Sequence, residues 1–300
     1  CSSDLQLEGL QPANLFLEQS PRDSTAAIAL AAAIPKNRES DVIVGSFAAD
    51  HAIADDKAFA RTIREAIEVA ATGRLVTIGI RPTFAATSFG YIHAGAPLEV
   101  AGAPHAREVN DFVEKPNKKV AQEFFESGNF LWNAGMFVAP ASLILEQVAK
   151  SEPELHDRIF EIAEAWDTPE RASLVAKYWP ELKKIAFDYT VAEPAAAAGL
   201  VAVIPSEFEW HDVGDFAGVA ELLSGGRPEN LAVIGDAQLL AEDSSGILVG
   251  QSKRLIAVVG LKDIIVVDTP DALLITTKEH AQGVKNIVET LKNSGHGDVL

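Results

Sequence analysis

The chain has 300 residues, 48% of them hydrophobic, so it can bury a sizeable core as one large domain or as a large domain and a small one. Its formal net charge of −18 excludes a nucleic-acid backbone or an anionic membrane as the main partner, because both require a basic surface. A nucleotide is not excluded, since one phosphate pocket needs only a few local cations or a metal ion.

The only cysteine is Cys1, so no internal disulfide can form, and a reducing compartment such as the cytoplasm fits this composition. No apolar stretch reaches the roughly 18 residues of a membrane helix, and the first residues do not form a signal peptide. We expect residues 1–6 to be non-native, because their sequence fits no pattern that follows.

The first elements are predicted to be a short strand at 14–18 and a helix that begins near Ser20. Ser20 can cap this helix, Pro21 fits its first position, and Asp23 stands three residues after the cap, as in a capping box. The alanine-rich run that follows should continue the helix as far as Pro35. The N-terminal end of such a helix can also hold an anionic ligand.

An apolar run at 42–46 predicts a buried strand, and Asp50 follows it closely. In open α/β sheets, ligands bind beyond the carboxyl ends of the strands. Asp50 is therefore a candidate for a metal or phosphate site, and the alternative is that it caps a turn.

The central part of the chain alternates between strand and helix patterns. A helix capped by Asp55 or Asp56 comes first, and a second helix should begin at Asn117 and end at Gly128. Gly90 lies inside a strand pattern, where glycine marks either a bulge or the close approach of a ligand or another backbone segment. The predicted strands are 74–80, 89–92, 108–114, 130–138 and 201–204, and the stretch 140–178 is predicted to be helical.

Two polar features stand out in the second half of this region. Asn133 interrupts an apolar strand, so its amide must either be satisfied within the protein or face a ligand. A second acidic cluster covers 207–215. Asp215 is well placed to cap the helix predicted at 216–223, which leaves Asp212 as the more available carboxylate.

The segment 224–230 is rich in glycine and proline and is predicted to be a linker. Short β-branched strands follow at 247–249, 255–259, 264–267 and 273–276, and a helix is predicted at 279–292. We therefore expect two domains, 1–226 and 227–300. The first should be a three-layer α/β/α Rossmann-like domain with a mostly parallel sheet, and the second a small β domain with a terminal helix.

Four motifs together resemble those of the sugar-1-phosphate nucleotidyltransferases. They are Ala-Asp-His at 49–51, Phe-Val-Glu-Lys-Pro at 112–116, Trp-Asn-Ala-Gly-Met-Phe at 132–137 and Trp-His-Asp-Val-Gly-Asp at 210–215. Each motif is weak by itself, but their order and spacing are similar to those of the guanylyl branch, the mannose-1-phosphate guanylyltransferases. The runs at 21–28 and 267–274 also look like that branch, so the resemblance covers most of the chain.

The resemblance implies that GTP and mannose 1-phosphate give GDP-mannose and pyrophosphate. It implies that Asp50 and Asp212 hold a Mg²⁺ ion and that Lys115 pairs with the phosphate of the sugar phosphate. Asp50, Lys115 and Asp212 are thus the expected catalytic residues. Glu114 would accept hydrogen bonds from sugar hydroxyls, Gly90 and Asn133 would line the sugar pocket, and Gly135 would allow close approach.

The resemblance also places the segment 18–25 near the guanine, so Glu18, Arg22, Ser24 and Thr25 are expected nucleotide-binding residues. His51 and His211 are interpreted as residues beside the site and not as catalysts, because the attacking phosphate is already ionised. The sequence is compatible with a homodimer. Neither a nucleic acid nor a membrane is expected as a partner.

The sequence also departs from the family. The family begins with a strand and a glycine-rich loop that surrounds the triphosphate, and no such segment is present in these 300 residues. We therefore expect the sequence to be truncated at its N-terminus and to have little activity by itself. The loop at 83–88 also differs from the family pattern before Gly90.

Two alternatives remain open from the sequence. One is a glucose-1-phosphate enzyme that uses a different nucleotide. The other is a non-catalytic regulatory paralogue, although such a protein would not need to retain both Asp50 and Asp212.

Overall fold

The computed structural model describes residues 15–38, 42–214, 216–224 and 231–295. The chain divides into two compact units. The first consists of Cys1–Ala48 and Asp55–Phe208, and the second of Ala49–Ala54 and Glu209–Leu300. The predicted boundary at 226/227 lies outside the described residues, whereas the units separate at 208/209, and the segment 49–54 joins the second unit.

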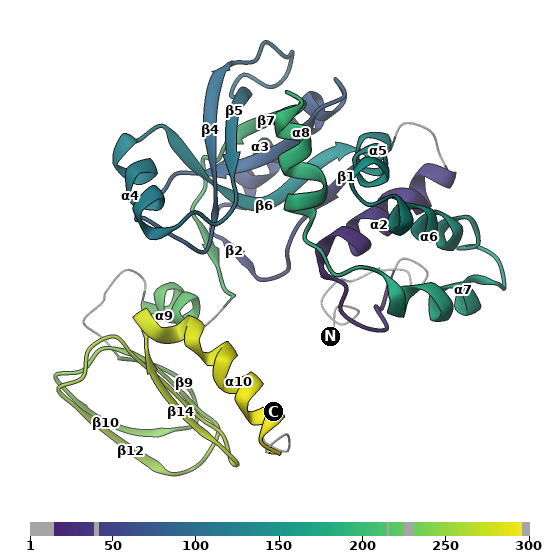
Figure 1. Cartoon of the computed structure of the whole chain (residues 1–300). Coiled ribbons are helices and arrows are strands. Elements are labelled where there is room, and N and C mark those ends of the chain that lie inside the picture. The colour runs from purple at the N-terminus through teal and green to yellow at the C-terminus, as the bar shows by residue number, and fades with distance from the viewer. Residues whose placement is uncertain (1–14, 39–41, 215, 225–230, 296–300) are drawn as a thin grey trace. The chain divides into compact units, whose positions relative to one another are not determined.

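The first unit contains a six-stranded sheet with the strand order β1-β6-β3-β7-β5-β4 (Figure 1). These strands confirm the five predicted in the central region and the one predicted at 42–46. Their bounds are β1 Ile43–Ser46, β3 Leu75–Ile80, β4 Gly90–Pro97, β5 Arg107–Val113, β6 Phe130–Pro140 and β7 Val201–Pro205.

The expectation of a mostly parallel sheet is not met by the described strands. β3 and β7 are parallel, whereas β6 runs antiparallel to β1, β3 and β4, and β5 runs antiparallel to β4 and β7. The physical reason is that β4 and β5 are joined by the turn at 98–106 and form a hairpin, while the long strand β6 returns between β1 and β3. Alternating strand and helix patterns do not by themselves report strand direction.

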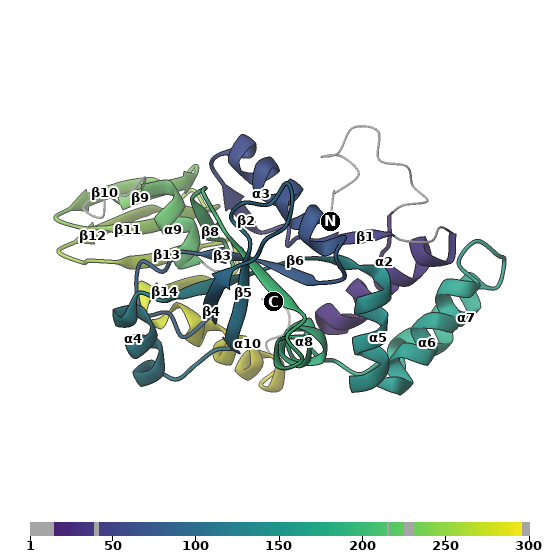
Figure 2. The same ribbon diagram turned by 90° about the horizontal axis from the view of Figure 1, so that it is seen from above.

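Helices cover both faces of this sheet, which gives the expected three layers. Figure 2 shows α3 on one face and α8 on the other. The core includes Leu75, Phe137 and Ile144, which are buried between the sheet and the helices. The helical elements are α2 Asp23–Arg38, α3 Asp56–Ala70, α4 Lys118–Ser127, α5 Ala141–Ser151, α6 Pro153–Glu164, α7 Arg171–Tyr178, η2 Trp179–Glu181, η3 Asp188–Ala192, which is one π-helical turn, and α8 Glu193–Ala197.

Three helix signals predicted from the sequence are confirmed. Asp55, not Asp56, caps α3, because its carboxylate accepts hydrogen bonds from the backbone N–H groups of Lys57 and Ala58. Asn117 caps α4 by accepting from the backbone of Val120. Gly128 ends α4 in the left-handed conformation, with φ of 69°.

The predicted start of the chain is wrong in two respects. Residues 15–18 form no strand, and α2 begins at Asp23 instead of after a cap at Ser20. Asp23 itself takes a left-handed φ of 64°, and its carboxylate accepts from the N–H of Ser24. The Ser20 carbonyl accepts from the indole of Trp179, so this segment is held by tertiary contacts that the local pattern could not show.

The second unit contains the short antiparallel pair β2 and β8 and a small parallel β structure. Strands β9, β11 and β13 pair in parallel, β10 pairs in parallel with β12, and β14 closes the larger sheet antiparallel to β13. The elements are β2 His51–Ile53, β8 Trp210–Asp212, α9 Phe216–Ser224, β9 Leu231–Gly235, β10 Gln238–Glu242, β11 Gly246–Gly250, β12 Leu255–Val259, β13 Ile264–Asp268, β14 Leu273–Thr277, η4 Lys278–Gly283 and α10 Val284–Asn293.

The four strands and the terminal helix predicted for this region are therefore confirmed, whereas β9 and β10 were missed. The missed strands are mostly exposed and have little apolar alternation, so the sequence gives a weak signal. Ile247 and Ile265 are fully buried and pack with Ala220 and Ala281. Asp215 and the segment 225–230, predicted to be a cap and a linker, lie outside the described residues.

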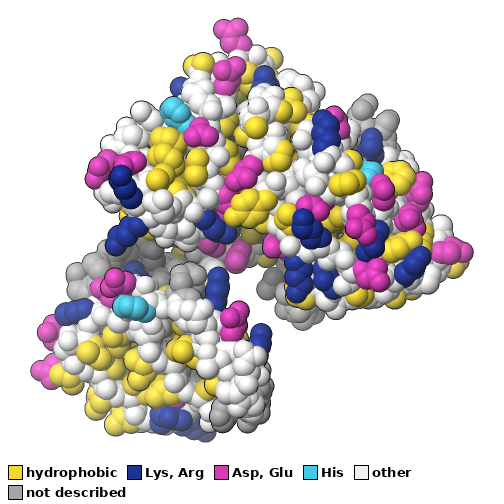
Figure 3. Space-filling view, viewed as in Figure 1, with side chains coloured by type: hydrophobic (Ala, Val, Ile, Leu, Met, Phe, Trp, Pro, Cys, Tyr) yellow, Lys and Arg dark blue, Asp and Glu magenta, His cyan; other side chains and the backbone are white. Residues whose placement is uncertain are grey.

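Acidic and basic side chains are interspersed on the face shown in Figure 3, and hydrophobic side chains gather on the second unit. Within the described part of the chain, no helix has both the length and the apolar character to cross a bilayer.

Candidate functional site

The second unit brings together Asp50, His51 and Asp212. The antiparallel pairing of β2 with β8 sets His51 opposite Asp212, and the N–H of Val213 donates to the carbonyl of Asp50 over 2.9 Å. One ligand atom from each of Asp50, His51 and Asp212 lies within 4.8 Å of the other two. Asp50 and Asp212 are far apart in the sequence, and strand pairing brings them to one point.

His51 was interpreted as a neighbour of the site and not as a catalyst, and the structure places it in this cluster. Its ring contacts the indole of Trp210 edge-on, with ring centroids 5.2 Å apart. Its Nδ1 is buried and has no hydrogen-bond partner among the described residues. Burial lowers the pKa of His51 against the opposing effects of Asp212 and Asp50, so the imidazole is favoured in its neutral form, which can act as a ligand.

This donor set fits a divalent cation. Two carboxylates supply the hard oxygen ligands that Mg²⁺ prefers, and a neutral imidazole is a ligand better suited to Mn²⁺ and later transition metals. Buried polar atoms are normally paired, and the unpaired Nδ1 leaves the His51 ring of this cluster with one unsatisfied nitrogen in the described structure. His211 directly precedes Asp212 in β8, so the two side chains point to opposite faces of the strand, and His211 does not belong to the cluster.

The first unit holds a second group of predicted site residues, at the end of β5. The Nζ atom of Lys115 lies 3.4 Å from Oε1 of Glu114. The side chain of Glu114 is only 8% exposed, whereas that of Lys115 is 59% exposed and can reach a ligand. Lys115 has a φ of 45°, which is unusual for a residue before proline and costs roughly 1–3 kcal/mol of strain.

Gly90 and Asn133 border the same carboxyl group. A Cβ atom at Gly90 would lie 2.5 Å from Oε2 of Glu114 and 3.3 Å from Cβ of Asn133. The glycine in this strand therefore marks close approach by a side chain, because a larger residue would require the carboxyl of Glu114 to shift from this position. Gly90 pairs with Asn133 across β4 and β6, which sets this geometry.

The Glu114 carboxyl is held in an unusual state. Burial, with a contribution from the negative charge of Asp188, raises the pKa of Glu114 to about 7, and Lys115 opposes this shift. Its Oε2 is buried and has no hydrogen-bond partner in the described structure. Perturbed carboxyl groups beside an exposed cation are a common property of binding sites.

Asp188 also belongs to this group, although no sequence motif had pointed to it. Its Oδ1 accepts a hydrogen bond of 2.9 Å from the amide of Asn133. Burial raises the pKa of Asp188, while Asn133 and Lys115 oppose the shift. The only signal in the sequence is an acidic residue inside the apolar run 185–192, which a helix prediction treats as solvent-exposed.

The predicted nucleotide-binding residues have structural contacts. Thr25 is fully buried, and its hydroxyl lies 2.8 Å from that of Thr190, so it has no surface to offer a ligand. The Ser24 hydroxyl accepts from the N–H of Phe187 over 2.8 Å. The Arg22 guanidinium donates to the carbonyls of Leu182 and Pro180, and Glu18 is exposed.

Gly135 has a conformational requirement of its own, and its predicted role in close approach of the sugar stays a prediction. It has a φ of 66°, and a Cβ there would meet nothing within 4 Å. The glycine is therefore required by the backbone conformation and not by close packing.

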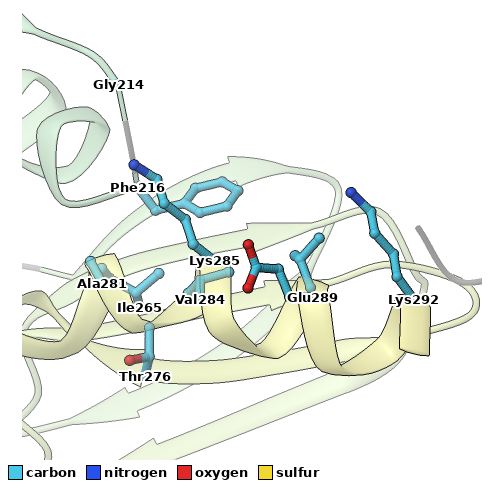
Figure 4. A pocket seen from close by; sticks show the side chains of 10 residues that line it. Gly214, Phe216, Ile265, Thr276, Ala281, Val284, Lys285, Glu289 and Lys292 are labelled. Carbon is cyan, nitrogen blue, oxygen red and sulfur yellow. The ribbon is translucent and has the colours of Figure 1, made fainter. Parts of the chain in front are cut away.

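A pocket of about 420 Å³ lies in the second unit beneath α10 (Figure 4). Its lining is largely apolar and includes Phe216, Ile265 and Val288, while Lys285 and Lys292 extend from α10. It contains none of Asp50, His51 and Asp212, so the chemistry expected for this chain does not lie in this pocket.

Comparison with known families assigns the fold and the family. A family model described as nucleotidyl transferase matches residues 6–225. The chain belongs to the nucleotidyl transferase family. A second model, the MannoseP isomerase/GMP-like beta-helix domain, matches residues 238–291 and agrees with the parallel strands of the second unit. The predicted α/β class and the small C-terminal β domain are thus confirmed.

Relatives of this nucleotidyl transferase carry specific names. The chain is 37% identical over 291 residues to the mannose-1-phosphate guanylyltransferase of Escherichia coli K12, and the match covers 94% of this chain and 58% of that protein. It is 34% identical over 306 residues to the xanthan biosynthesis protein XanB of Xanthomonas campestris pv. campestris B100, covering 99% of this chain and 61% of that protein. The chain therefore spans about three fifths of the length of these relatives.

A solved structure from Thermus thermophilus, described as a mannose-1-phosphate geranyltransferase, matches with a TM-score of 0.80 and 26% identity. The match covers 97% of this chain and 80% of that one. The resemblance to the mannose-1-phosphate guanylyltransferases inferred from the sequence is thus confirmed at the level of homology.

Proposed function

We propose that this nucleotidyl transferase makes GDP-mannose from GTP and mannose 1-phosphate. A phosphate oxygen of the sugar phosphate forms a bond to the α-phosphorus of GTP, the bond between the α-phosphorus and the bridging oxygen breaks, and pyrophosphate leaves. The observation that carries the proposal is the Glu114–Lys115 pair beside Gly90 and Asn133, in a chain similar to enzymes named for this reaction.

Three predicted site residues of the first unit, Lys115, Glu114 and Asn133, each contribute to binding the sugar phosphate. The exposed ammonium of Lys115 pairs with its phosphate as a point charge. The orphaned Oε2 of Glu114 and the Asn133 amide supply hydrogen bonds to sugar hydroxyls. Because phosphoryl transfer depends mainly on positioning and charge neutralisation, these residues act by holding the reacting phosphate in place.

Asp50 and Asp212 would hold the divalent cation, and Mg²⁺ is our proposal for its identity. When bound, such an ion supplies charge neutralisation to phosphate oxygens. His51 completes the donor set, so Mn²⁺ is the ion to compare with Mg²⁺. Arg22, Ser24 and Thr25 act indirectly in this proposal, by fixing the segment at 180–190, while the exposed Glu18 remains the proposed contact to the nucleotide.

The test measures turnover and binding in parallel. Pyrophosphate release is followed with GTP, UTP, ATP or dTTP, each combined with mannose 1-phosphate or glucose 1-phosphate, in the presence of Mg²⁺. Calorimetric binding of mannose 1-phosphate examines the sugar site whether or not turnover occurs. Preference for glucose 1-phosphate in both assays would replace the proposal with the glucose enzyme, and binding without turnover in a chain extended to the relatives' length would favour a regulatory paralogue.

We also propose a cytoplasmic location, where GTP and sugar phosphates are available, and no nucleic-acid or membrane partner.

Self-association as a homodimer is proposed because β10 and β12 present exposed apolar side chains on one face, with Leu240 62% and Val259 68% exposed. Light scattering coupled to gel filtration tests this: a monomeric mass unchanged by Leu240→Glu would refute it.

A further inference from the structure

We propose that Asp188 is a positioning residue of the sugar-phosphate site, which fixes the carboxamide of Asn133 and faces the carboxyl of Glu114. The inference rests on the proposed function of this site and names a residue that the family motifs did not include.

The first step concerns the direction of the Asn133 amide. Its Oδ1 accepts from the hydroxyl of Thr77 over 2.8 Å and from the N–H of Gly135 over 3.1 Å, and its Nδ2 donates to Asp188 over 2.9 Å. Asn133 is 7% exposed and Thr77 is fully buried. A flipped amide would place donor against donor at Gly135 and acceptor against acceptor at Asp188, and buried unpaired groups are costly.

The second step concerns what the fixed amide faces. Three of its four hydrogen-bonding positions are taken by protein groups in the described structure, which leaves one N–H for a ligand. A Cβ at Gly90 would lie 3.6 Å from Nδ2 of Asn133 and 2.5 Å from Oε2 of Glu114. The amide nitrogen and the orphaned carboxyl oxygen therefore both lie next to Gly90, so the fixed amide and the carboxyl of Glu114 belong to one group of polar atoms.

The third step concerns charge. Burial is the main cause that raises the pKa of Glu114, and the charges of Asp188 and, to a smaller extent, Glu193 add to it, while Lys115 opposes it. Burial also raises the pKa of Asp188, with a small contribution from Asp23. Two buried carboxyl groups, Glu114 and Asp188, thus share the nearby Lys115, which favours a proton on the Glu114–Asp188 pair near neutral pH. A protonated carboxyl can donate to a sugar oxygen as well as accept, so ligand binding should be linked to proton uptake or release.

The fourth step concerns what holds Asp188 in place. The segment before α8 is tied to the start of α2 by Thr25 and Thr190, whose hydroxyls lie 2.8 Å apart, and by the N–H of Phe187, which donates to Ser24. The N–H of Thr25 also donates to the carbonyl of Ile185 over 3.3 Å. Ser24 and Thr25, two of the residues predicted to bind the nucleotide, therefore anchor the turn that presents Asp188.

The test compares Asp188→Ala with Asp188→Asn in the full chain. Binding of mannose 1-phosphate is measured by calorimetry in buffers of different ionisation enthalpy, which reports the protons exchanged. Asp188→Ala should weaken binding about tenfold or more, because the Asn133 amide loses its acceptor. Asp188→Asn retains an acceptor and should stay within about threefold, but the proton exchange and the pH profile should shift to lower pH because the charge facing Glu114 is lost.

The control is Asp157→Ala, which removes an exposed carboxylate on α6 that contacts His156. It should leave affinity and proton exchange unchanged. If Asp188→Ala fails to fold, the isosteric Asp188→Asn decides, and wild-type proton exchange in that variant overturns the inference. Wild-type affinity in a folded Asp188→Ala also overturns it and leaves the proposed function intact, whereas a parent chain that binds no mannose 1-phosphate overturns the proposed function itself.

Discussion

At the scale of single residues, the glycine at position 90 shows how a small side chain controls a binding group. Gly90→Ala would place a Cβ 2.5 Å from Oε2 of Glu114, so the carboxyl must move from its present position. We expect mannose 1-phosphate to bind about fivefold or more weakly, as overpacking at a fixed site costs about 1–3 kcal/mol. Calorimetry measures this effect.

The matched control is Gly283→Ala. A Cβ there would meet nothing within 4 Å, and Gly283 has an ordinary φ of −67°. Equal affinity in the two variants would show that the position of the Glu114 carboxyl does not determine sugar binding.

Glu114 also predicts a pH dependence of stability. Because its pKa is raised from 4.5 to about 7, the folded state keeps a proton that the unfolded state releases. This group therefore stabilises the fold below pH 4.5, and the contribution is lost as the pH rises through about 7.

Glu114→Gln should remove that slope, which is at most about 1.4 kcal/mol per pH unit for one proton. Urea unfolding at several pH values within this window measures it. Glu123→Gln, on the exposed part of α4, is the control and should follow the parent protein. Parallel pH profiles for the parent protein and Glu114→Gln would contradict the buried state of Glu114.

At the scale of elements, the helix caps separate what the sequence shows from what it leaves open. The sequence allowed Asp55 or Asp56 as the cap of α3, and the structure assigns Asp55 by its hydrogen bonds to Lys57 and Ala58. Asp55→Ala should therefore cost about 1 kcal/mol of unfolding free energy. Asp56→Ala should cost less, because it loses only a charge near the helix N-terminus. Urea denaturation ranks the two, and the reverse order would refute the assignment.

Local patterns predicted most elements of the first unit because caps, turns and apolar runs act over a few residues. They did not predict the antiparallel direction of β6, since direction depends on which strands meet in the sheet. They also failed at Ser20, where the helix start is fixed by contacts with Trp179 from 159 positions away. Local sequence propensity contains no information about contacts between residues so far apart in the sequence.

The candidate site was predictable to a similar degree. Asp50, Asp212, Glu114, Lys115 and Asn133 were reached through motif resemblance, and the structure gathers them into two groups. Asp188 was missed, because its contact with Asn133 comes from burial and from a partner distant in sequence, and His51 was expected only as a neighbour of the site. Thr25 was assigned to the nucleotide, whereas its buried hydroxyl bonds to Thr190.

At the scale of the whole molecule, each unit has its own core, so each can unfold as a separate cooperative transition. The fully buried Ile247 identifies the transition of the second unit. Ile247→Ala should lower that transition selectively, since large-to-small substitutions in a core cost about 2–5 kcal/mol. Scanning calorimetry detects it, and Ile159→Ala in the first core should lower the other transition.

All three residues of the candidate metal site belong to the second unit, although Asp50 and His51 interrupt the sequence of the first. A divalent cation that binds only the folded site should therefore raise the transition marked by Ile247→Ala. The gain is about 2.7 kcal/mol at a hundredfold excess over Kd. Asp50→Asn should abolish the gain, while Asp56→Asn, which lies outside the cluster, should preserve it. A cation-dependent gain that survives in Asp50→Asn, or that appears only in the transition marked by Ile159→Ala, would place the metal elsewhere.

The dependence on Mg²⁺ or Mn²⁺ then reports how far the His51 imidazole contributes, because nitrogen ligands favour Mn²⁺ over Mg²⁺.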